Sequence, residues 1–459
     1  MSSKAVSPDR PNIILILTDD QGPWAAGCYG NDEIRTPNID RLAATGTRLD
    51  NFFCATPVCS PSRATFLTGR IPSQHGIHDW IADGNVGPGA VEPLRDEIAY
   101  TDVLAAHGYH CGLSGKWHMG NSQRPQHGFD FWYAHQRGGG PYYDPPMIRD
   151  GEPVTDEGYV TDLITEEALG YIDRHRNEPF YLSVHYTAPH SPWIGNHPQE
   201  IVDSYDDCPF NSCPQEEMHP WAISLTESNL GNREALKGYF AAVTAMDACV
   251  GQIIDRVESH RLREDTLIIF ASDNGMSCGH HGFWGKGNGT WPRNMYENSV
   301  RVPALMSQPG SIPVGSSDAL LSAYDFMPTL LDYLGFEIPL GQNLPGRSFM
   351  PILRGEKTQL AEEICVYDEY GPVRMIRTAD WKYVYRHSHG PDDLFHLAED
   401  PDERVNLADD PGYQEMRREL YGMMNEWFAC YVIPERDGLR ESSEYAWIGD
   451  YRTRLCDRK

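Results

Sequence analysis

The chain has 459 residues, enough for two or three domains or for one large domain with an appendage. Hydrophobic residues make up 40% and charged residues 23% of the chain, so a large core is available. The formal net charge of −28, with 38 Lys and Arg against 66 Asp and Glu, argues against nucleic-acid binding, which needs clustered cations. An anionic substrate must therefore be attracted by a local cationic pocket or a metal ion.

The N-terminal residues 1–12 lack the apolar stretch of a signal peptide, and no later run reaches about 18 apolar residues. We expect no membrane span, and a cytoplasmic location for the chain as given, or a periplasmic or secreted one if a leader was removed. The 11 cysteines, an odd and scattered set without a CxxC pattern, predict no disulfide framework. Cys208 and Cys213 are close enough for a local pair, and two free thiols are the alternative.

Strand and helix patterns alternate through the first three-quarters of the chain. Residues 12–20 form an apolar run that ends in two acids, which is typical of a buried parallel strand. Residues 36–53 have the apolar spacing of a helix. Further along we expect a helix, a turn and a strand over 101–120, a strand over 178–193, the longest helix over 232–260, and a strand over 265–275. This alternation predicts an α/β fold with a large mixed, mostly parallel sheet sandwiched by helices.

The last hundred residues differ in character. Short aromatic and β-branched runs at 363–370, 373–387 and 392–397 predict a smaller antiparallel sheet, followed by a closing helix over about 413–430. Pro and Gly are frequent between residues 340 and 355. We therefore predict a catalytic domain over 1–345 and a C-terminal subdomain over 346–459.

Polar side chains mark the carboxyl ends of the predicted parallel strands, where open sheets bind ligands. Two pairs supply only oxygen donors, which suit a hard divalent cation, Ca²⁺ or Mg²⁺: Asp19 with Asp20, and Asp273 with Asn274. A helix cap or a solvated turn is the alternative for one such pair. Two pairs, each closing a buried strand, favour a metal site.

Cationic side chains accompany these acids. Arg63 follows Cys59 by one helical turn, so that both can face the same point. Lys116 and His118 are two residues apart and share one face if extended. Two more lie in glycine-rich and proline-rich segments: Lys286 and His190. A thiolate beside an arginine is a plausible nucleophile, but hard ligands and a hard cation call for an oxygen nucleophile where the sequence has Cys59.

The segment CSPSRATFLTGR, residues 59–70, resembles the signature of the type I sulfatases of the alkaline phosphatase superfamily, in which C-x-P-S-R followed by x-x-x-L-T-G-R directs oxidation of the cysteine to formylglycine. The resemblance extends through PNIILILTDDQG, GKWHMG, APHSP and SDNG to the closing DLFHLAEDPDERVNLA. It implies that Cys59 is a precursor, which a formylglycine-generating maturation enzyme converts into an aldehyde. The hydrated aldehyde is then the missing oxygen nucleophile.

The same resemblance implies a role for each polar residue. Five residues would bind the metal: Asp19, Asp20, Asp273, Asn274 and the modified Cys59. Arg63 would hold the hydrate, and Lys116 and His118 would bind the sulfate and the nucleophile, with His118 also helping to release sulfate. His190 and Lys286 would contact the sulfate and the bridging oxygen, one of them as general acid.

Two features qualify this transfer of roles. His185 lies in the same strand as His190 and is the alternative to it, although the family's histidine usually follows Ala-Pro, as His190 does. After Lys286 the chain inserts several residues before Tyr296 and Glu297, and then has Asn-Ser where the family commonly has Gly-Gly. This longer loop reshapes the pocket rim, so substrate assignments do not transfer.

Aromatic and polar residues near the motifs are candidates for a sugar-binding rim: His75, His78, Asp79, Trp80, His281, Trp284, Trp291 and Arg293. Core packing is the alternative for each of them. Together they favour a sulfated carbohydrate over a simple aryl sulfate. The expected partners are a sulfated small molecule or glycan and the maturation enzyme.

Three other functions remain as alternatives. A phosphonate monoester hydrolase or phosphodiesterase of the same superfamily is the nearest. A non-catalytic sulfoglycan-binding protein would retain an unmodified Cys59 and an eroded site, whereas every expected polar position is filled here. A cysteine hydrolase would need a histidine paired with the thiol and no metal cluster.

Overall fold

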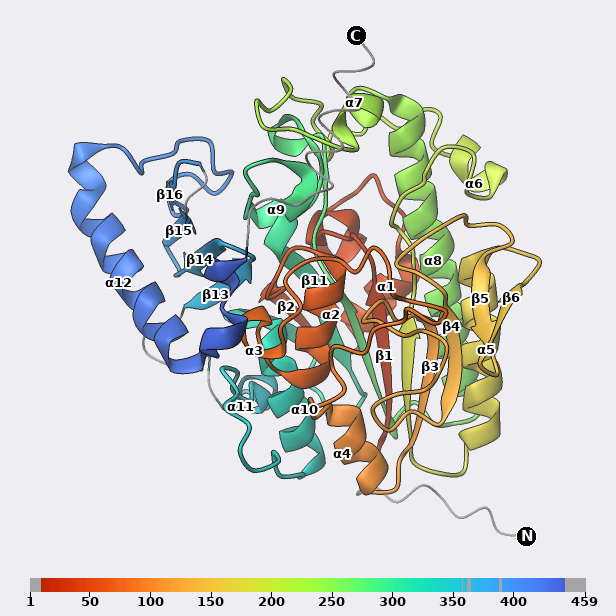
Figure 1. Ribbon diagram of the computed structural model, residues 1–459. Helices are drawn as coiled ribbons and strands as arrows, with labels where there is room; N and C mark the ends of the chain where they lie inside the picture. Colours follow the sequence, from red (N-terminus) through yellow and green to blue (C-terminus); the bar gives the residue numbers. More distant parts are fainter. Residues whose placement is uncertain (1–9, 357, 361–364, 388–389, 442–459) are drawn as a thin grey trace.

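The computed structural model describes residues 10–356, 358–360, 365–387 and 390–441. A mixed sheet of ten strands crosses its centre in the order β12-β2-β11-β8-β1-β7-β3-β4-β5-β6 (Figure 1). Neighbouring strands in the middle run parallel: β8 (Thr266–Ser272), β1 (Asn12–Thr18), β7 (Phe180–His185), β3 (His110–Lys116) and β4 (Phe131–His135). Their side chains are nearly all buried, which explains their apolar sequences. The predicted mixed sheet and these four predicted strands, β1, β3, β7 and β8, are confirmed.

The remaining strands extend the sheet at its two edges: β2 (Thr47–Phe53), β11 (Arg301–Ser307) and β12 (Gly315–Ser322) on one side, and β5 (Pro146–Arg149) and β6 (Glu152–Thr155) on the other. The helix predicted over 36–53 is wrong in its second half, because α1 (Pro37–Ala44) stops before β2 begins. Gly46 lies between the two elements. A side chain there would collide with the backbone of Met306 and Ser307, so only glycine lets the chain approach β11 closely.

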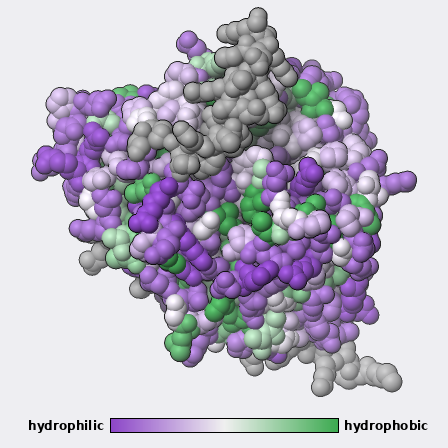
Figure 2. Space-filling model, in the orientation of Figure 1, coloured by the Kyte–Doolittle hydropathy of each residue, from purple (hydrophilic) through white to green (hydrophobic). Residues whose placement is uncertain are grey.

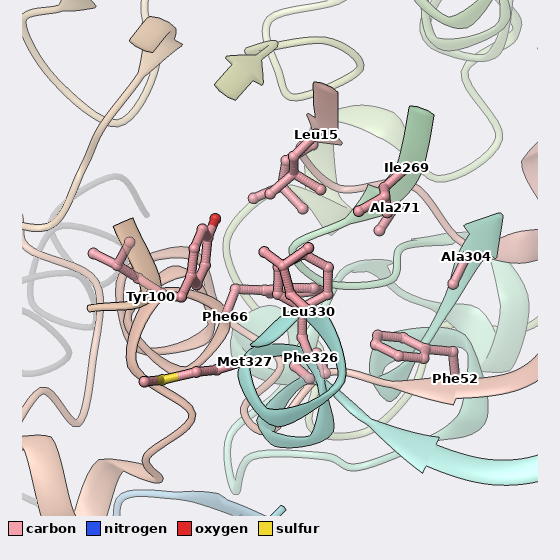
Figure 3. Close-up of a cluster of buried hydrophobic side chains, with 14 of the residues drawn as sticks. Leu15, Phe52, Phe66, Tyr100, Ile269, Ala271, Ala304, Phe326, Met327 and Leu330 are labelled. Atoms are coloured by element: carbon pink, nitrogen blue, oxygen red, sulfur yellow. The ribbon is translucent and has the colours of Figure 1, made fainter. Parts of the chain in front are cut away.

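Helices cover both faces of the sheet, and successive residues of β1 point to opposite sides. Ile14 and Ile16 pack against α1, α5 (Val160–His175) and α8 (Arg233–Ser259). Leu15 packs on the other face with α2 (Cys59–Thr68), α4 (Tyr100–Ala106) and α10 (Phe326–Leu334). Figure 3 shows this second cluster, in which Phe66 of α2 and Leu330 of α10 lie beneath Leu15. The long helix predicted over 232–260 is confirmed as α8.

Shorter elements complete the chain between these units: α3 (Pro72–His75), α6 (Gln199–Asp203), α7 (Thr226–Asn229), α9 (Glu297–Val300), α11 (Met350–Leu353), β9 (Ser277–Cys278) and β10 (Trp284–Gly285). Strands β9 and β10 form a small antiparallel pair. This pair belongs to the segment that carries Lys286.

A second sheet of four antiparallel strands follows: β13 (Val366–Tyr370), β14 (Val373–Arg377), β15 (Trp381–Arg386) and β16 (Asp393–His396). The predicted closing helix is α12 (Gln414–Tyr431), which packs on this sheet (Figure 1). The antiparallel sheet and its helix are confirmed, although residues 363 and 364 of the first predicted strand lie outside the described residues. The domain boundary near residue 345 stays a prediction.

Cys208 and Cys213 are both free thiols, so of the two alternatives for this pair the structure has the unpaired one. Within the described part of the chain, no helix combines the length and apolar character that crossing a bilayer requires. The face shown in Figure 2 is largely hydrophilic, with scattered hydrophobic residues.

Candidate active site

The carboxyl ends of the central parallel strands bring the predicted polar residues to one edge of the sheet. Asp19 and Asp20 follow β1, Lys116 ends β3, and Asp273 and Asn274 follow β8. All five side chains are buried. Because these strands are parallel neighbours, the topology itself places their carboxyl ends together.

Helix α2 delivers Cys59 to the same point. The preceding Val58 is extended, and Cys59 is the first helical residue, where backbone N–H groups lack helical partners and the helix dipole is positive. Pro61 is tolerated because it lies in the first turn. The helix ends at Gly69, whose φ of 69° lies in the left-handed region that glycine adopts readily.

Cys59 lies among charged groups. Its Sγ donates to Oδ1 of Asp19 at 3.3 Å and accepts from Nζ of Lys286 at 2.9 Å. Burial, together with the charge of Asp19, raises the pKa of the Cys59 thiol to about 12. The thiol is therefore kept protonated, and a reactive thiolate is disfavoured.

Each deep cation is paired with one carboxylate. Lys116 pairs with Asp19, and Lys286 pairs with Asp20. Burial by itself raises the pKa of Asp19, but the charges of Lys116 and His190 outweigh it, and the pKa falls below its usual value. The pKa of Asp20 is lowered in the same way, with Lys286 as the main opposing charge. Both carboxylates are thus held in their ionised form.

The third pair joins helix α2 to strand β8. Nε of Arg63 donates to Oδ2 of Asp273 at 2.8 Å, and both side chains are fully buried. Nη1 of Arg63 donates to the backbone oxygen of Lys116 at 3.1 Å. Burial and the nearby charge of Asp19 raise the pKa of Asp273, because Arg63 offsets them only in part. Arg63 thereby fixes the position of α2 relative to two strand ends.

The acidic groups have the composition of a divalent-cation site. One carboxylate oxygen from each of Asp19, Asp20 and Asp273, and Sγ of Cys59, lie within 4.8 Å of one another. Nδ2 of Asn274 donates to Oδ1 of Asp20 at 2.6 Å, whereas Oδ1 of Asn274 is buried without a hydrogen-bond partner. Buried oxygens normally have a partner, and a hard cation bound to the three carboxylates would supply one for Oδ1 of Asn274. The residues present therefore fit Ca²⁺ or Mg²⁺.

Three histidines surround this cluster. His118 has a φ of 54°, uncommon for a non-glycine residue, and its Nδ1 is buried without a partner while Nε2 lies 3.0 Å from the backbone oxygen of Ile81. His190 is partly exposed, and its Nε2 lies 3.8 Å from Oδ2 of Asp20. His185 instead bonds the backbone oxygen of Lys116 through Nδ1 at 3.1 Å.

Two family models match this chain. One, described as Sulfatase, covers residues 11–336, and one, described as N-sulphoglucosamine sulphohydrolase, C-terminal, covers residues 279–429. The chain belongs to the sulfatase family. This sulfatase is an enzyme that hydrolyses sulfate esters, and the family typically uses formylglycine and a divalent metal.

Several known sulfatases resemble it over most of its length. The N-acetylglucosamine-6-O-sulfatase of Bacteroides thetaiotaomicron is 28% identical over 96% of this chain and 90% of its own. The human N-acetylgalactosamine-6-sulfatase is 31% identical over 76% of this chain and 66% of its own. A solved structure described as a complex with its substrate, D-glucosamine-2-N,6-O-disulfate, has a TM-score of 0.78 and 25% identity, and covers 94% of this chain and 100% of that one.

A cavity of about 570 Å³ opens above the cluster in this sulfatase. It brings together five predicted side chains from separate segments: Asp20, Cys59, His118, His190 and Lys286. His185 does not line it, which agrees with the preference for His190. Arg63 and Lys116 are also absent from its lining and lie beneath it, in contact with the carboxylates.

Trp80 is the one predicted rim residue that lines this cavity. Trp284, by contrast, is fully buried with its ring centroid 5.1 Å from that of Trp193. Arg293 is buried over the Tyr370 ring, 3.7 Å from its centroid, and Nη2 donates to Asp79 at 2.9 Å. The expectation that these residues form a rim is corrected: they pack in the protein interior.

The other rim candidates also lie outside the cavity lining. His281 stacks on Tyr296 with ring centroids 4.0 Å apart, and Trp291 lies beside Arg293. His75 is buried next to Thr65, and His78 is buried near Glu441. An aromatic or histidine near a motif is as compatible with packing as with binding, so sequence alone does not separate the two.

Several residues that line the cavity were not predicted from the sequence: Asp83, Arg137, Gly138, Gly139, Ser191, Ser224 and Asn288. The most visible signal was the run RGGG at residues 137–140, which follows β4. Consecutive glycines near a binding edge indicate close approach of the backbone to another group.

Proposed function

We propose that this sulfatase acts on a sulfated carbohydrate, with a formylglycine formed from Cys59 and a divalent cation, Ca²⁺ or Mg²⁺. One observation carries the proposal. Cys59, three carboxylates and the unpartnered Oδ1 of Asn274 lie together, buried at the base of one cavity. No such set of hard ligands is needed for thiol chemistry.

Five residues would hold the cation: Asp19, Asp20, Asp273, Asn274 and the modified residue 59. When bound, a divalent cation supplies positive charge for the oxygens of the sulfate group. The hydrated aldehyde at position 59 supplies an oxygen nucleophile in place of the protonated thiol. The reaction consumes one water molecule and yields the free alcohol and sulfate.

The cations of the chain itself neutralise charge around the sulfate. Lys116 and Lys286 are held at the base of the site by their pairs with Asp19 and Asp20. Arg63 lies beneath them and orients Asp273. These groups are held in place before the substrate arrives, so little reorganisation is needed as charge shifts toward the oxygens.

His190 is the better placed general acid for the leaving alcohol. Its side chain is 27% exposed and lines the cavity, whereas that of Lys286 is 7% exposed and contacts Cys59. Because Nδ1 of His190 lies 2.7 Å from the backbone oxygen of Ser191, Nε2, on the side of Asp20, is the atom that would carry a proton to the leaving oxygen. General acid catalysis of this kind contributes about 10²–10⁴-fold to the rate.

A carbohydrate fits the cavity above these groups. Its volume, about 570 Å³, lies in the range of small-ligand sites, about 300–1,000 Å³. Trp80, which is 38% exposed, offers a ring face to a sugar, and Ser191, Ser224 and Asn288 supply polar groups. The names of the bacterial and human relatives also point to amino-sugar sulfates.

The test begins with the mass of the peptide that spans Cys59, from protein made together with a maturation enzyme. We expect the mass decrease that accompanies exchange of the thiol for an aldehyde. Converted enzyme should then release sulfate from amino-sugar 6-sulfates in the presence of Ca²⁺. Converted enzyme that cleaves phosphate diesters and leaves every sulfate ester intact would instead establish the phosphodiesterase alternative.

A further inference from the structure

The loop between β4 and β5 lies directly against two histidines of the site. A methyl group at Gly138 would come closer than 3.0 Å to the ring of His118, and one at Gly139 would lie 3.1 Å from Nδ1 of His190. The backbone at residues 138 and 139 therefore packs against both rings, and at Gly138 a side chain would force the loop or the His118 ring to move.

The same loop is anchored at both of its ends. The backbone N–H of Arg137 lies 3.1 Å from Nδ1 of His135, the last residue of β4. The hydroxyl of Tyr142 donates to the backbone oxygen of His190 at 2.7 Å. Arg137 directly precedes Gly138. Its backbone position relative to His118 and His190 is therefore fixed by these contacts.

Arg137 differs from the deep cations of the site. Its side chain is exposed and lines the cavity. Arg63, Lys116 and Lys286 each pair with a carboxylate, whereas the Arg137 guanidinium makes no ion pair or hydrogen bond with any described residue. The chain has 66 acidic residues and only 38 lysines and arginines, so most cations can find an acidic partner. An arginine at a cavity mouth without such a partner among the described residues is available for an external anion.

We propose that Arg137 binds a second anionic group of the substrate, a sulfate or a carboxylate, while the scissile sulfate lies at residue 59. This inference rests on the proposed function and adds to it that the preferred substrate carries a further negative charge near the scissile ester. The planar guanidinium suits both groups, because it can donate two parallel hydrogen bonds to a pair of oxygens.

The rest of the cavity mouth agrees with this orientation. Asp83 lines the same cavity from the segment that follows Trp80 and would repel an anion on its own side. Trp80 lines the same cavity and offers a ring face to the sugar. The second anion is therefore directed toward Arg137, and hydroxyl groups toward Asp83.

The test compares three substrates: glucosamine 6-O-sulfate, glucosamine-2-N,6-O-disulfate, and a sulfated disaccharide that contains a uronate. The quantity measured is the ratio of kcat/KM for each doubly charged substrate to kcat/KM for the monosulfate. We expect a ratio above one for the native enzyme, and a fall of roughly tenfold or more in Arg137→Gln. Arg137→Lys should fall between them, since it keeps the charge and loses the paired donors.

A matched control removes the same charge elsewhere. Arg176, exposed at the end of α5, donates to the backbone oxygen of Asp173 and lies outside the cavity lining. Arg176→Gln should leave the ratio unchanged, which excludes an effect of net charge. The two doubly charged substrates distinguish a sulfate from a carboxylate as the group bound.

The same ratio can be measured without turnover. In the Cys59→Ala background, calorimetry gives the affinities for the disulfate and the monosulfate with and without Arg137→Gln. An equal effect of Arg137→Gln on both ligands, or a native preference for the monosulfate, would overturn the inference. If converted native enzyme releases sulfate from none of the substrates, the proposed function fails, and a calorimetric ratio that still depends on Arg137 supports the second-anion site on its own.

Discussion

Replacing Gly138 by alanine should lower activity, because the added methyl group overlaps the ring of His118. The added carbon would lie closer than 3.0 Å to three atoms of the His118 ring, where an ordinary contact is 3.4–4 Å. The ring or the loop must therefore shift by on the order of 1 Å. A displacement of that size at a reacting group costs about 10²-fold in rate, and we expect kcat/KM to fall by that factor.

The position two residues along the chain provides the control. A methyl group at Gly140 would lie 3.4 Å from the His135 ring, which is an ordinary contact. Gly140→Ala should therefore keep kcat/KM within about threefold of the native value, since a change without overlap seldom costs much. Both variants should be compared by steady-state kinetics on one sulfate ester and by thermal unfolding.

The outcome depends on the loop being unable to move away. Its anchors are the bonds from Arg137 to His135 and from Tyr142 to the backbone of His190. If Gly138→Ala retains nearly full activity and stability, the loop yields and does not set the position of His118. If both alanine variants lose activity equally, loop flexibility rather than overlap with His118 is responsible.

Three more predictions follow from the contacts described above. His190→Gln should reduce turnover of a sugar sulfate by about 10²–10⁴-fold and that of a nitrophenyl sulfate much less, because the nitrophenolate leaves without a proton; equal losses would contradict the general-acid role. Chelation with EDTA should abolish turnover and lower the Tm, because Asp19, Asp20 and Asp273 then lack a shared cation, and added Ca²⁺ should restore both; an unchanged Tm would argue against the metal site. Burial raises the pKa of Asp247 from 3.8 to about 6 in the folded state. Ionisation of this carboxyl therefore lowers the free energy of unfolding as pH rises from the unfolded-state pKa through the folded-state pKa. The free energy of unfolding of Asp247→Asn, measured with urea, should therefore rise relative to that of the native chain as the pH increases from about 4 to about 7. The same pH dependence in both proteins would refute the raised pKa of Asp247.

The arrangement of the site could be predicted from the sequence because topology leaves few choices. Once Asp19, Lys116 and Asp273 are assigned to the ends of parallel strands, the sheet must bring them to one edge. Residues 47–53 were less predictable, because their apolar positions suit a helix as well as a strand. Pairing with β11 and β12 makes this segment a strand, and the close approach of Gly46 to Met306 that accompanies it joins residues 260 positions apart in sequence.

The cavity rim could not be predicted for a similar reason. Trp284 and Trp80 both lie near motif residues in the sequence, yet one ring is fully buried and the other is 38% exposed. Burial depends on whether distant side chains such as Trp193 fill the space beside the ring. Arg137, in turn, makes no ion pair with any residue that the structure describes, and the lack of an ion pair has no local sequence signature.

The charges at the base of the cavity explain how a chain with a net charge of −28 can bind an anionic ester. The carboxylates of Asp19, Asp20 and Asp273 are matched by Lys116, Lys286 and Arg63, so the protein groups alone cancel. The bound divalent cation would then make the base of the site net positive, and Arg137, which pairs with no acid in the described part of the chain, adds a positive charge at the mouth. Such buried charges are screened weakly by salt, whereas exposed Arg137 is screened strongly. Increasing ionic strength should therefore weaken binding of a doubly charged substrate more than that of a monosulfate, and the Arg137→Gln variant should lose this difference.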